Sequence, residues 1–320
     1  MESLETLDKK FSIFDSDISD DMFEDLDSSE KSTDDISSPS VSYWKNAWIR
    51  LKKDPLALMG IFIIVIISLA AVFGPMIIPY AYDGMDIAIQ NQGPSYGHWF
   101  GTDKFGRDIF VRTLYGARIS LTIGFLAAFL NGVIGVLYGG IAGYTGGKID
   151  MVMMRIVDVI TSVPSLLYII LIMMYLGNNV QSILVALCLT YWTGTARQVR
   201  SQILSLKHQD FVLAARVVGE NKFQILVHHL IPNSMGPIIV TVTFLIPQAI
   251  FQEAFLSFLG IGIQVPMASW GTLANDAIPA LFTQPYQMFF PVLCISFTML
   301  ALNFIGDGLR DALDPRLKKI

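Results

Sequence analysis

Residues 56–78 form an apolar run of 23 residues without a single charged side chain. At a rise of about 1.5 Å per residue, a helix of that length crosses a hydrocarbon layer of about 30 Å. A segment inside a bilayer must satisfy its own backbone hydrogen bonds, and an α-helix does so. The run therefore predicts a transmembrane helix, and it restricts the chain to folds that are built around a bilayer.

More apolar runs follow, so several spans are expected. Hydrophobic residues make up 53% of the 320 positions and charged residues only 15%, which is too apolar for an ordinary soluble domain. In the second run Gly135, Gly139 and Gly143 recur at every fourth position, a spacing that lets helices approach closely. The chain is predicted to be an all-α membrane protein with six transmembrane helices in one domain at 56–306. The expected spans are 56–78, 119–144, 157–176, 180–196, 231–259 and 288–305.

Three segments outside these spans have a composition of their own. Residues 1–40 contain 13 acids and 3 bases, and they are expected to form a disordered acidic cytoplasmic tail, with a regulatory or partner-binding role as the alternative. Residues 41–55 place Trp44, Ala47, Trp48 and Leu51 on one stripe, as in a helix that lies at the membrane surface; a plain linker is the alternative. Residues 307–320 are expected to be a cytoplasmic tail.

Basic residues near the ends of the spans indicate the orientation, because they favour the cytoplasmic side. The segment before the first span, the second and fourth loops and the C-terminal tail carry them, and the third and fifth loops carry none. Both termini and the fourth loop are therefore expected in the cytoplasm. The first loop is placed outside because one span precedes it, although it contains four bases beside four acids. These are Lys104, Arg107, Arg112, Arg118, Asp83, Asp86, Asp103 and Asp108.

The segment between the fourth and fifth spans is amphipathic, and we expect it to form a helix, a turn and a second helix. Ala214 and Ala215 favour a helix, and Gly219 provides the backbone freedom that a turn needs. Pro232 lies where a new membrane helix would begin. Small residues in this segment would let another protein come close.

No residue pattern indicates catalysis or metal binding. The sequence has no phosphate-binding G-x-x-x-x-G-K-[ST] loop, so any ATP hydrolysis is expected on another chain. The four histidines lack the spacing of metal ligands, and both cysteines, Cys188 and Cys294, lie in apolar runs. Asp158 and Glu253 are acids near or within spans and could line a pathway. Asp158 is expected to pair with Arg155, one turn away, and Glu253 to lie near the outer end of its span, where water is available.

Four blocks, in this order, resemble the C-type permease subunits of the oligopeptide and dipeptide ABC importers. The first is HWFGTDKFGRD at 98–108 with GARISL at 116–121, and the second is the segment 213–233 with its paired alanines and its following glycine. The third is FLGIG at 258–262 with SWG at 269–271, and the fourth is DGLRDALDPR at 307–316. Together they extend over most of the chain from about residue 43 onward.

The resemblance implies the fold of a type I ABC importer permease, with a cytoplasmic coupling segment at 197–230 that carries the EAA motif. It implies no catalytic residue, metal or cofactor in this chain, with ATP and Mg bound by partner ATPase subunits. The implied partners are a homologous second permease, two cytoplasmic ATPases and an extracellular peptide-binding lipoprotein, in the cell membrane of a bacterium and without nucleic acid. It assigns contact with the ATPase to seven positions: Leu213, Ala214, Ala215, Arg216, Gly219, Phe223 and Pro232.

The sequence departs from the family pattern at two places, and the cargo and the class of transporter also have alternatives. Leu213 stands where the family usually has Glu before the paired alanines, and residues 1–40 have no counterpart in the pattern. Related permeases with the same blocks carry nickel complexes, glutathione or antimicrobial peptides. A transporter that works without ATP is the alternative from another class, with Asp158 and Glu253 as its coupling groups.

Overall fold

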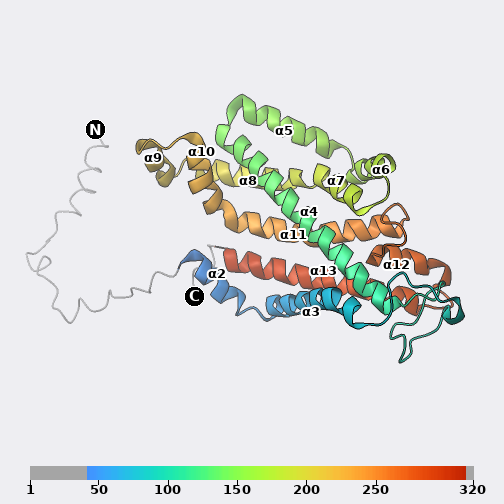
Figure 1. The fold of residues 1–320 in the computed structure, drawn as a ribbon. Coiled ribbons are helices and arrows are strands. Elements are labelled where there is room, and N and C mark those ends of the chain that lie inside the picture. Colours follow the sequence, from blue (N-terminus) through green and yellow to red (C-terminus); the bar gives the residue numbers. More distant parts are fainter. Residues whose placement is uncertain (1–41, 315–320) are drawn as a thin grey trace, which may run out of the picture. The chain divides into compact units, whose positions relative to one another are not determined.

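The structure, a computed structural model, describes residues 42–314, and within that range every regular element is a helix. The chain divides into two units, residues 1–45 and 46–320, and the second contains every helix except the start of α2. The predicted tail at 1–40 and the last basic residues, 316, 318 and 319, lie outside the described range. The elements (Figure 1) are α2 (Tyr43–Leu51), α3 (Pro55–Ile77), η3 (Ile87–Ile89), α4 (Ile109–Thr145), α5 (Gly147–Ser162), α6 (Ser165–Leu176), α7 (Val180–Thr190), α8 (Trp192–Leu206), α9 (Asp210–Val217), α10 (Lys222–Gln224), η4 (Ile225–Leu230), α11 (Ile231–Phe258), α12 (Trp270–Ala277), η5 (Ile278–Ala280) and α13 (Tyr286–Leu313).

Helix α3 confirms the first predicted span to within one residue at each end. Asp54 caps its N-terminus, because one carboxylate oxygen accepts the N–H groups of Leu56 at 2.9 Å and Ala57 at 3.2 Å. One face of α3 packs against α13, which runs beside it in Figure 1. The opposite face exposes large apolar side chains, among them Phe62 and Leu69. A helix that contacts lipid needs such a surface.

Helix α4 is 37 residues long and packs against α3, α8 and α11 (Figure 1). It begins before the predicted start at 119, because the Asp108 carboxylate accepts the N–H of Val111 at 2.8 Å and caps the helix there. Gly135, Gly139 and Gly143 face α8. A Cβ atom on Gly139 would collide with the backbone of Ala196, so only glycine allows this approach. The close packing that the glycine spacing predicts is confirmed.

The third predicted span, 157–176, was expected as one interrupted helix, and it is instead divided between two helices. Helices α5 and α6 meet at Pro164 with a bend of 79°. Pro164 has no N–H to donate, and it forces the preceding residue, Val163, into an extended conformation with ψ 133°. The proline therefore breaks the span rather than merely bending it.

The fourth predicted span, 180–196, corresponds to α7 and the first turn of α8. The two helices are joined at Tyr191, whose backbone dihedrals are helical. Gly177 makes the turn after α6 with a φ of 83°, and Asn179 caps α7 by accepting the N–H of Ser182 at 2.9 Å. Helices α6 and α7 pack against each other, as their short connection predicts.

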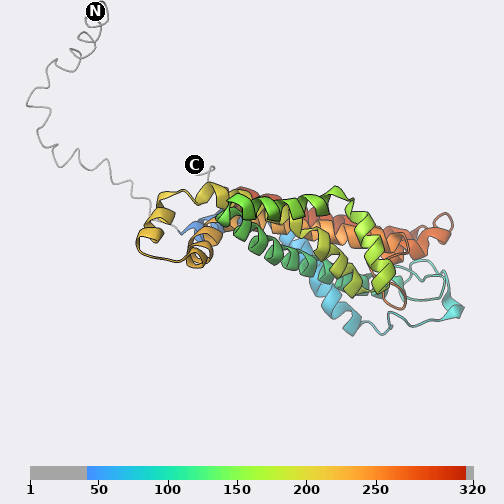
Figure 2. The ribbon, with the colours of Figure 1, turned by 90° about the horizontal axis from the view of Figure 1, so that it is seen from above.

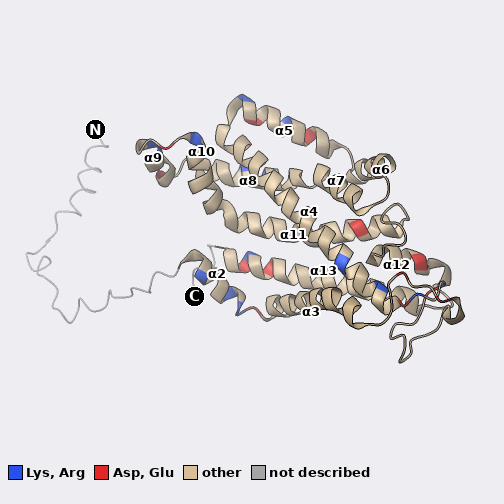
Figure 3. Ribbon diagram, viewed as in Figure 1, with Lys and Arg blue, Asp and Glu red and all other residues tan. Residues whose placement is uncertain are grey.

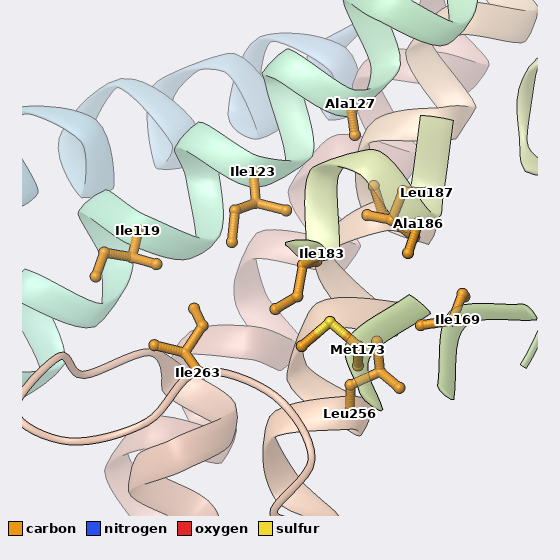
Figure 4. Packing of buried hydrophobic residues seen from close by; sticks show 11 residues of the cluster. Ile119, Ile123, Ala127, Ile169, Met173, Ile183, Ala186, Leu187, Leu256 and Ile263 are labelled. Atoms are coloured by element: carbon orange, nitrogen blue, oxygen red, sulfur yellow. The ribbon is translucent and has the colours of Figure 1, made fainter. Parts of the chain in front are cut away.

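The largest group of buried apolar side chains ties the α6–α7 pair to α4 and α11. In Figure 4, Ile123 of α4 lies opposite Ile183 of α7, Ile119 of α4 lies near Ile263, and Met173 of α6 lies beside Leu256 of α11. Every one of these side chains is less than a tenth exposed. Contacts between helices that are distant in sequence therefore fix the bundle at this end.

Four helices of the described range are long and apolar enough to cross a membrane: α3, α4, the helix from Lys222 to Phe258, and α13. The bent pair of α5 and α6 makes a fifth if it counts as one span. Helix α7, with 11 residues, is too short to count alone, so the predicted number of six is not reached by length and composition. Figure 3 shows charged residues mainly at the two ends of the helices, with long uncharged stretches between them.

Candidate functional site

The coupling segment has the predicted form of a helix, a turn and a second helix. Helix α8 ends at Leu206, α9 follows at Asp210–Val217, and a helical segment begins again at Lys222. In Figure 2 the α9–α10 region (gold) extends beyond the ends of the long helices at one end of the bundle. One side of the segment is exposed and has no partner among residues 42–314.

The turn after α9 depends on Gly219. This residue has a φ of 93°, a conformation that side-chain-bearing residues rarely adopt. The Gly219 N–H donates to the carbonyl of Arg216, and the Glu220 N–H donates to the carbonyl of Ala215, both at 3.1 Å. These two bonds form a Schellman motif, which ends a helix and satisfies its last carbonyl groups. The need for positive φ at this glycine is thereby confirmed.

Side-chain bonds hold the start of the second helix. Asn221 and Gln224 form a capping box, in which each side chain accepts the other residue's backbone N–H at 2.9 Å. His229 Nε2 lies 2.8 Å from a carboxylate oxygen of Glu220 and links the turn to the following helix. The turn is therefore fixed on both of its sides.

The second helix and the fifth span are one continuous helix, where the sequence indicated a new start at Pro232. The helix runs from Lys222 to Phe258 through a π-helical stretch, Ile225–Leu230. In that stretch the N–H of Ile231 donates to the carbonyl of Leu226, five residues back. Pro232 has no N–H to donate, and its ring would clash with the carbonyl group four residues before it. The wider π turn avoids this clash. Movement of the segment would therefore pass directly into α11.

The side of the coupling segment that faces the bundle is apolar and buried. Val212 and Ala215 of α9 pack with Ile225 and Leu226 of the π-helical stretch. The same cluster includes Ile203 of α8, so the segment rests on the end of that helix. All of these side chains are less than a tenth exposed. The segment is thus firmly attached to the transmembrane helices.

The opposite side exposes four large apolar side chains, which we call the apolar tip: Leu213, Val217, Val218 and Phe223. Val217 is 87% exposed, Val218 83% and Phe223 72%, in a segment that also contains charged residues. A cluster of exposed apolar side chains among polar neighbours is typical of a surface that binds another protein.

The residues assigned to ATPase contact divide between the two sides. Leu213, Ala214, Arg216, Phe223 and Pro232 are exposed, whereas Ala215 is buried on the side that faces the bundle. Contact with an ATPase stays a prediction for all of them. For Ala215 the structure assigns a packing role.

The sequence suggested that Asp158 pairs with Arg155, but in the structure it has a different partner. Its carboxylate lies 2.9 Å from the guanidinium of Arg197, which also donates to the hydroxyl of Thr161 at 2.9 Å. Arg197 comes from α8, so the partner is 39 residues away in sequence and local spacing gives no sign of it. Both side chains of the pair are about half exposed.

The expectation that water reaches Glu253 is wrong. The Glu253 side chain has no exposed surface, and its carboxylate accepts the hydroxyl groups of Ser120 at 2.7 Å and Ser257 at 2.8 Å. Ser120 belongs to α4, so the carboxyl group connects α4 to α11. A side chain without exposed surface lines no pathway in this conformation.

Sequence reasoning did not find two further ionic contacts. The Asp150 carboxylate accepts two hydrogen bonds from Arg200, the longer at 2.6 Å, and this bond raises the pKa of the Arg200 guanidinium. At the other end of the helices, buried Arg107 and Arg112 both lie within ion-pair distance of Asp103 and Asp276. Asp276 is more than 160 residues away from both arginines in the sequence. Only the cluster of charged residues at 103–108 indicated an ionic contact from the sequence.

Two family models match the chain. One is described as a binding-protein-dependent transport system inner membrane component and matches residues 135–319. The other is described as the N-terminal TM domain of oligopeptide transport permease C and matches residues 42–94. Together they extend over most of the described range.

Relatives with similar sequences are known from several bacteria. The chain is 49% identical over 290 residues to the dipeptide transport system permease protein DppC of Bacillus subtilis (strain 168), which covers 90% of this chain and 91% of the relative. It is 48% identical over 298 residues to the oligopeptide transport system permease protein OppC of the same organism, covering 93% and 98%. The OppC protein of Escherichia coli (strain K12) is 40% identical over 277 residues, covering 86% and 92%.

Solved structures share the fold at low sequence identity. Two crystal forms titled as inward facing conformations of the MetNI methionine ABC transporter align with TM-scores of 0.53 and 0.51, at 18% and 20% identity. The alignments cover 63% and 62% of this chain and 96% and 94% of the matched chains. At these identities the likeness concerns the fold alone.

Proposed function

The chain belongs to the family of binding-protein-dependent transport system inner membrane components, and from this premise we propose that it is a permease subunit of an ATP-driven importer of oligopeptides or dipeptides. It forms half of a translocation pathway and has no catalytic residue of its own. ATP and Mg are bound and ATP is hydrolysed on two cytoplasmic ATPase subunits. A homologous second permease and an extracellular peptide-binding lipoprotein complete the importer, in the cell membrane of a bacterium.

The observation that carries the proposal is that the coupling segment has one exposed apolar side and one side buried against the bundle. Its apolar tip is exposed, while its other side is packed into the bundle through Val212 and Ala215. The tip is the surface that docks to an ATPase. Because the segment continues without a break into α11, a displacement at the tip moves that helix as well. Closure of the ATPase dimer on ATP would then switch the pathway between inward and outward access.

The proposed topology has six spans, with both termini and the coupling segment in the cytoplasm. Helix α7 and the first turn of α8 act as the fourth span, and the bent pair of α5 and α6 acts as the third. The pairing of Arg107 and Arg112 with Asp103 and Asp276 supports an external first loop. Because the two arginines are paired with two aspartates, the group carries little net charge. An external position of this loop is therefore consistent with the positive-inside rule.

Other cargoes within the same architecture, such as nickel complexes, differ from this proposal only in the solute. An ATP-independent transporter would need acids that face a path. Asp158 is paired with Arg197, and Glu253 is enclosed by hydroxyl groups, so neither presents a free carboxylate. No contact in the described range favours that alternative.

The test is copurification of the tagged chain from membranes, followed by identification of its subunits by mass. The expected result is a complex with a second permease and two ATPase chains. Phe223→Ser, which removes an exposed ring from the apolar tip, should release the ATPases and keep the second permease. Asn233→Ser is the control, because Asn233 is exposed on the same continuous helix but is not part of the apolar tip. A chain that purifies without any ATPase before substitution contradicts the proposal.

A further inference from the structure

A cavity of about 350 Å³ opens where two breaks in the helices meet α11. It lies between the break at Pro164, the joint of α7 and α8 at Tyr191, and α11 at Leu245. Leu245 is at the midpoint of α11, and the lining residues at 160–165 and 190–194 lie in the cytoplasmic halves of the third and fourth spans, so the cavity extends from about the middle of the membrane toward its cytoplasmic side. Irregular backbone at such a depth occurs only where protein covers it or where it lines a water-filled space, and transporters use such breaks for substrate sites.

The wall of this cavity is polar, but none of its eleven lining residues is charged. It combines hydroxyl groups with one side-chain amide. Its polar members are Thr161, Ser165, Thr190, Tyr191, Thr193 and Gln248. Such a wall donates and accepts hydrogen bonds without preferring either sign of charge.

The face onto which the cavity opens is unsuited to lipid. The amide of Gln248 is exposed and has no hydrogen-bond partner among residues 42–314. The half-exposed ion pair of Asp158 and Arg197 adjoins the same face, because Arg197 donates to the lining residue Thr161. An unpaired amide and an ion pair are both costly in hydrocarbon. The face of α3 that carries Phe62 and Leu69 has the opposite, lipid-facing character.

A second cavity, of about 440 Å³, continues along the same stripe of α11. Pro237 and Thr241 line the second cavity, and Leu245 and Gln248 line the first. Steps of three or four residues place all four on one side of the helix. The second cavity lies toward the end of α11 that continues into the coupling segment. The two cavities therefore follow one helix face from mid-depth to the cytoplasmic end.

We propose that the first cavity binds the main chain of the transported peptide, and that Gln248 is the side chain that hydrogen-bonds it. This inference rests on the proposed function. A carboxamide both donates and accepts, as a peptide bond does, so it can pair with the backbone of any peptide. The absence of charge among the lining residues means that the side chains of the cargo are not selected there. The importer then passes peptides of either charge at similar rates through this point.

The test measures uptake by the complete importer in proteoliposomes, with the binding protein and ATP, for Ala-Ala-Ala, Ala-Lys-Ala and Ala-Glu-Ala. Gln248→Leu should lower all three rates by a similar factor of about three to ten, as expected for one lost hydrogen bond. Gln248→Glu should slow Ala-Glu-Ala more than Ala-Lys-Ala, relative to the unsubstituted complex. Gln248→Lys should do the reverse.

The matched control is Thr243→Val. Thr243 lies on α11 and lines neither cavity, and within residues 42–314 its hydroxyl bonds only to the carbonyl of Ile239 on its own helix. This variant should transport all three peptides as before. If Gln248→Glu and Gln248→Lys change the three rates by equal factors, or leave them unchanged, Gln248 does not contact the cargo and the inference fails. Loss of the second permease from the Gln248 variants also overturns it, since Gln248 is then an interface residue.

Failure of the inference is distinguishable from failure of the proposed function. If the unsubstituted complex transports none of the three peptides, the peptide importer assignment itself is wrong. If that complex transports them and the charged variants do not discriminate, only the site at Gln248 is wrong.

Discussion

Glu253 carries a carboxyl group into the interior of the bundle, where apolar side chains would ordinarily be expected. Its two oxygens accept the hydroxyl groups of Ser120 and Ser257, and Ser257 in turn accepts the N–H of Ile263 at 3.3 Å. A short chain of hydrogen bonds thus links α4, α11 and the loop that follows α11. Buried polar groups of this kind are costly when a partner is removed, because the remaining groups stay unsatisfied.

Substitution of this residue tests its role at the residue scale. Glu253→Ala leaves two buried hydroxyl groups without their acceptor and opens a cavity, so the free energy of unfolding should fall by roughly 2–5 kcal/mol. Glu253→Gln keeps the volume and one carbonyl acceptor, and its loss should be smaller. Thermal unfolding of the purified complex measures both. Equal losses for the two variants would mean that the hydrogen bonds are not the cause.

At the scale of elements, the contact between α4 and α8 depends on residues without side chains. A Cβ atom on Gly139 collides with the Ala196 backbone, whereas one on the next residue, Gly140, would lie 3.5 Å from Leu226, an ordinary contact. The two glycines are adjacent in sequence and differ only in the face of α4 that they occupy. They therefore separate the effect of packing from the effect of helix propensity.

Gly139→Ala should destabilise the bundle and lower the amount of folded protein in the membrane, because backbone must move to admit the methyl group. Gly140→Ala should be neutral or stabilising, since alanine favours a helix by about 1 kcal/mol over glycine. Fluorescence-detected size-exclusion profiles of the two variants provide the comparison. A Gly139→Ala protein as abundant and monodisperse as Gly140→Ala would show that the helices do not meet closely at this position.

The elements that apolar length determines were predictable from the sequence, and those that depend on distant partners were not. Residues 56–78 predicted α3, and Gly219 predicted the turn of the coupling segment, because both sequence patterns are local. Pro164 was visible as an interruption, but how far α5 and α6 bend apart depends on their packing. The partners of Asp158 and Glu253 come from other helices, so spacing along the chain suggested the wrong neighbour for one and the wrong environment for the other.

At the scale of the whole molecule, the two ends of the bundle use charge differently. At the end with the first loop, Arg107 and Arg112 are buried and paired with Asp103 and Asp276. At the end with the coupling segment, exposed Arg216 and Lys222 lie beside the apolar tip. The buried ion pairs make the end with the first loop rigid. The exposed residues at the end with the coupling segment form a surface that a partner can cover. In the proposed function, the ATPases dock at the second end.

Gly219 connects the turn, the apolar tip and the attachment to α11, so a substitution at this position probes the coupling between the ATPases and the transmembrane helices. No heavy atom lies within 4 Å of a Cβ added at Gly219, so a substitution there acts through backbone conformation and the exposed surface rather than through a clash inside the chain. Valine at a φ of 93° is strained by about 1–3 kcal/mol, and it alters the shape of the tip. Asparagine tolerates positive φ better and serves as the control.

The measurement is the amount of ATPase that copurifies with the tagged chain, together with peptide uptake, for Gly219→Val and Gly219→Asn. Gly219→Val should insert and fold normally, because the membrane helices are unchanged, yet retain little ATPase and transport poorly. Gly219→Asn should remain closer to the unsubstituted importer in both respects. If Gly219→Val binds the ATPases and imports peptide at the unsubstituted level, the coupling segment is not the link between motor and pathway.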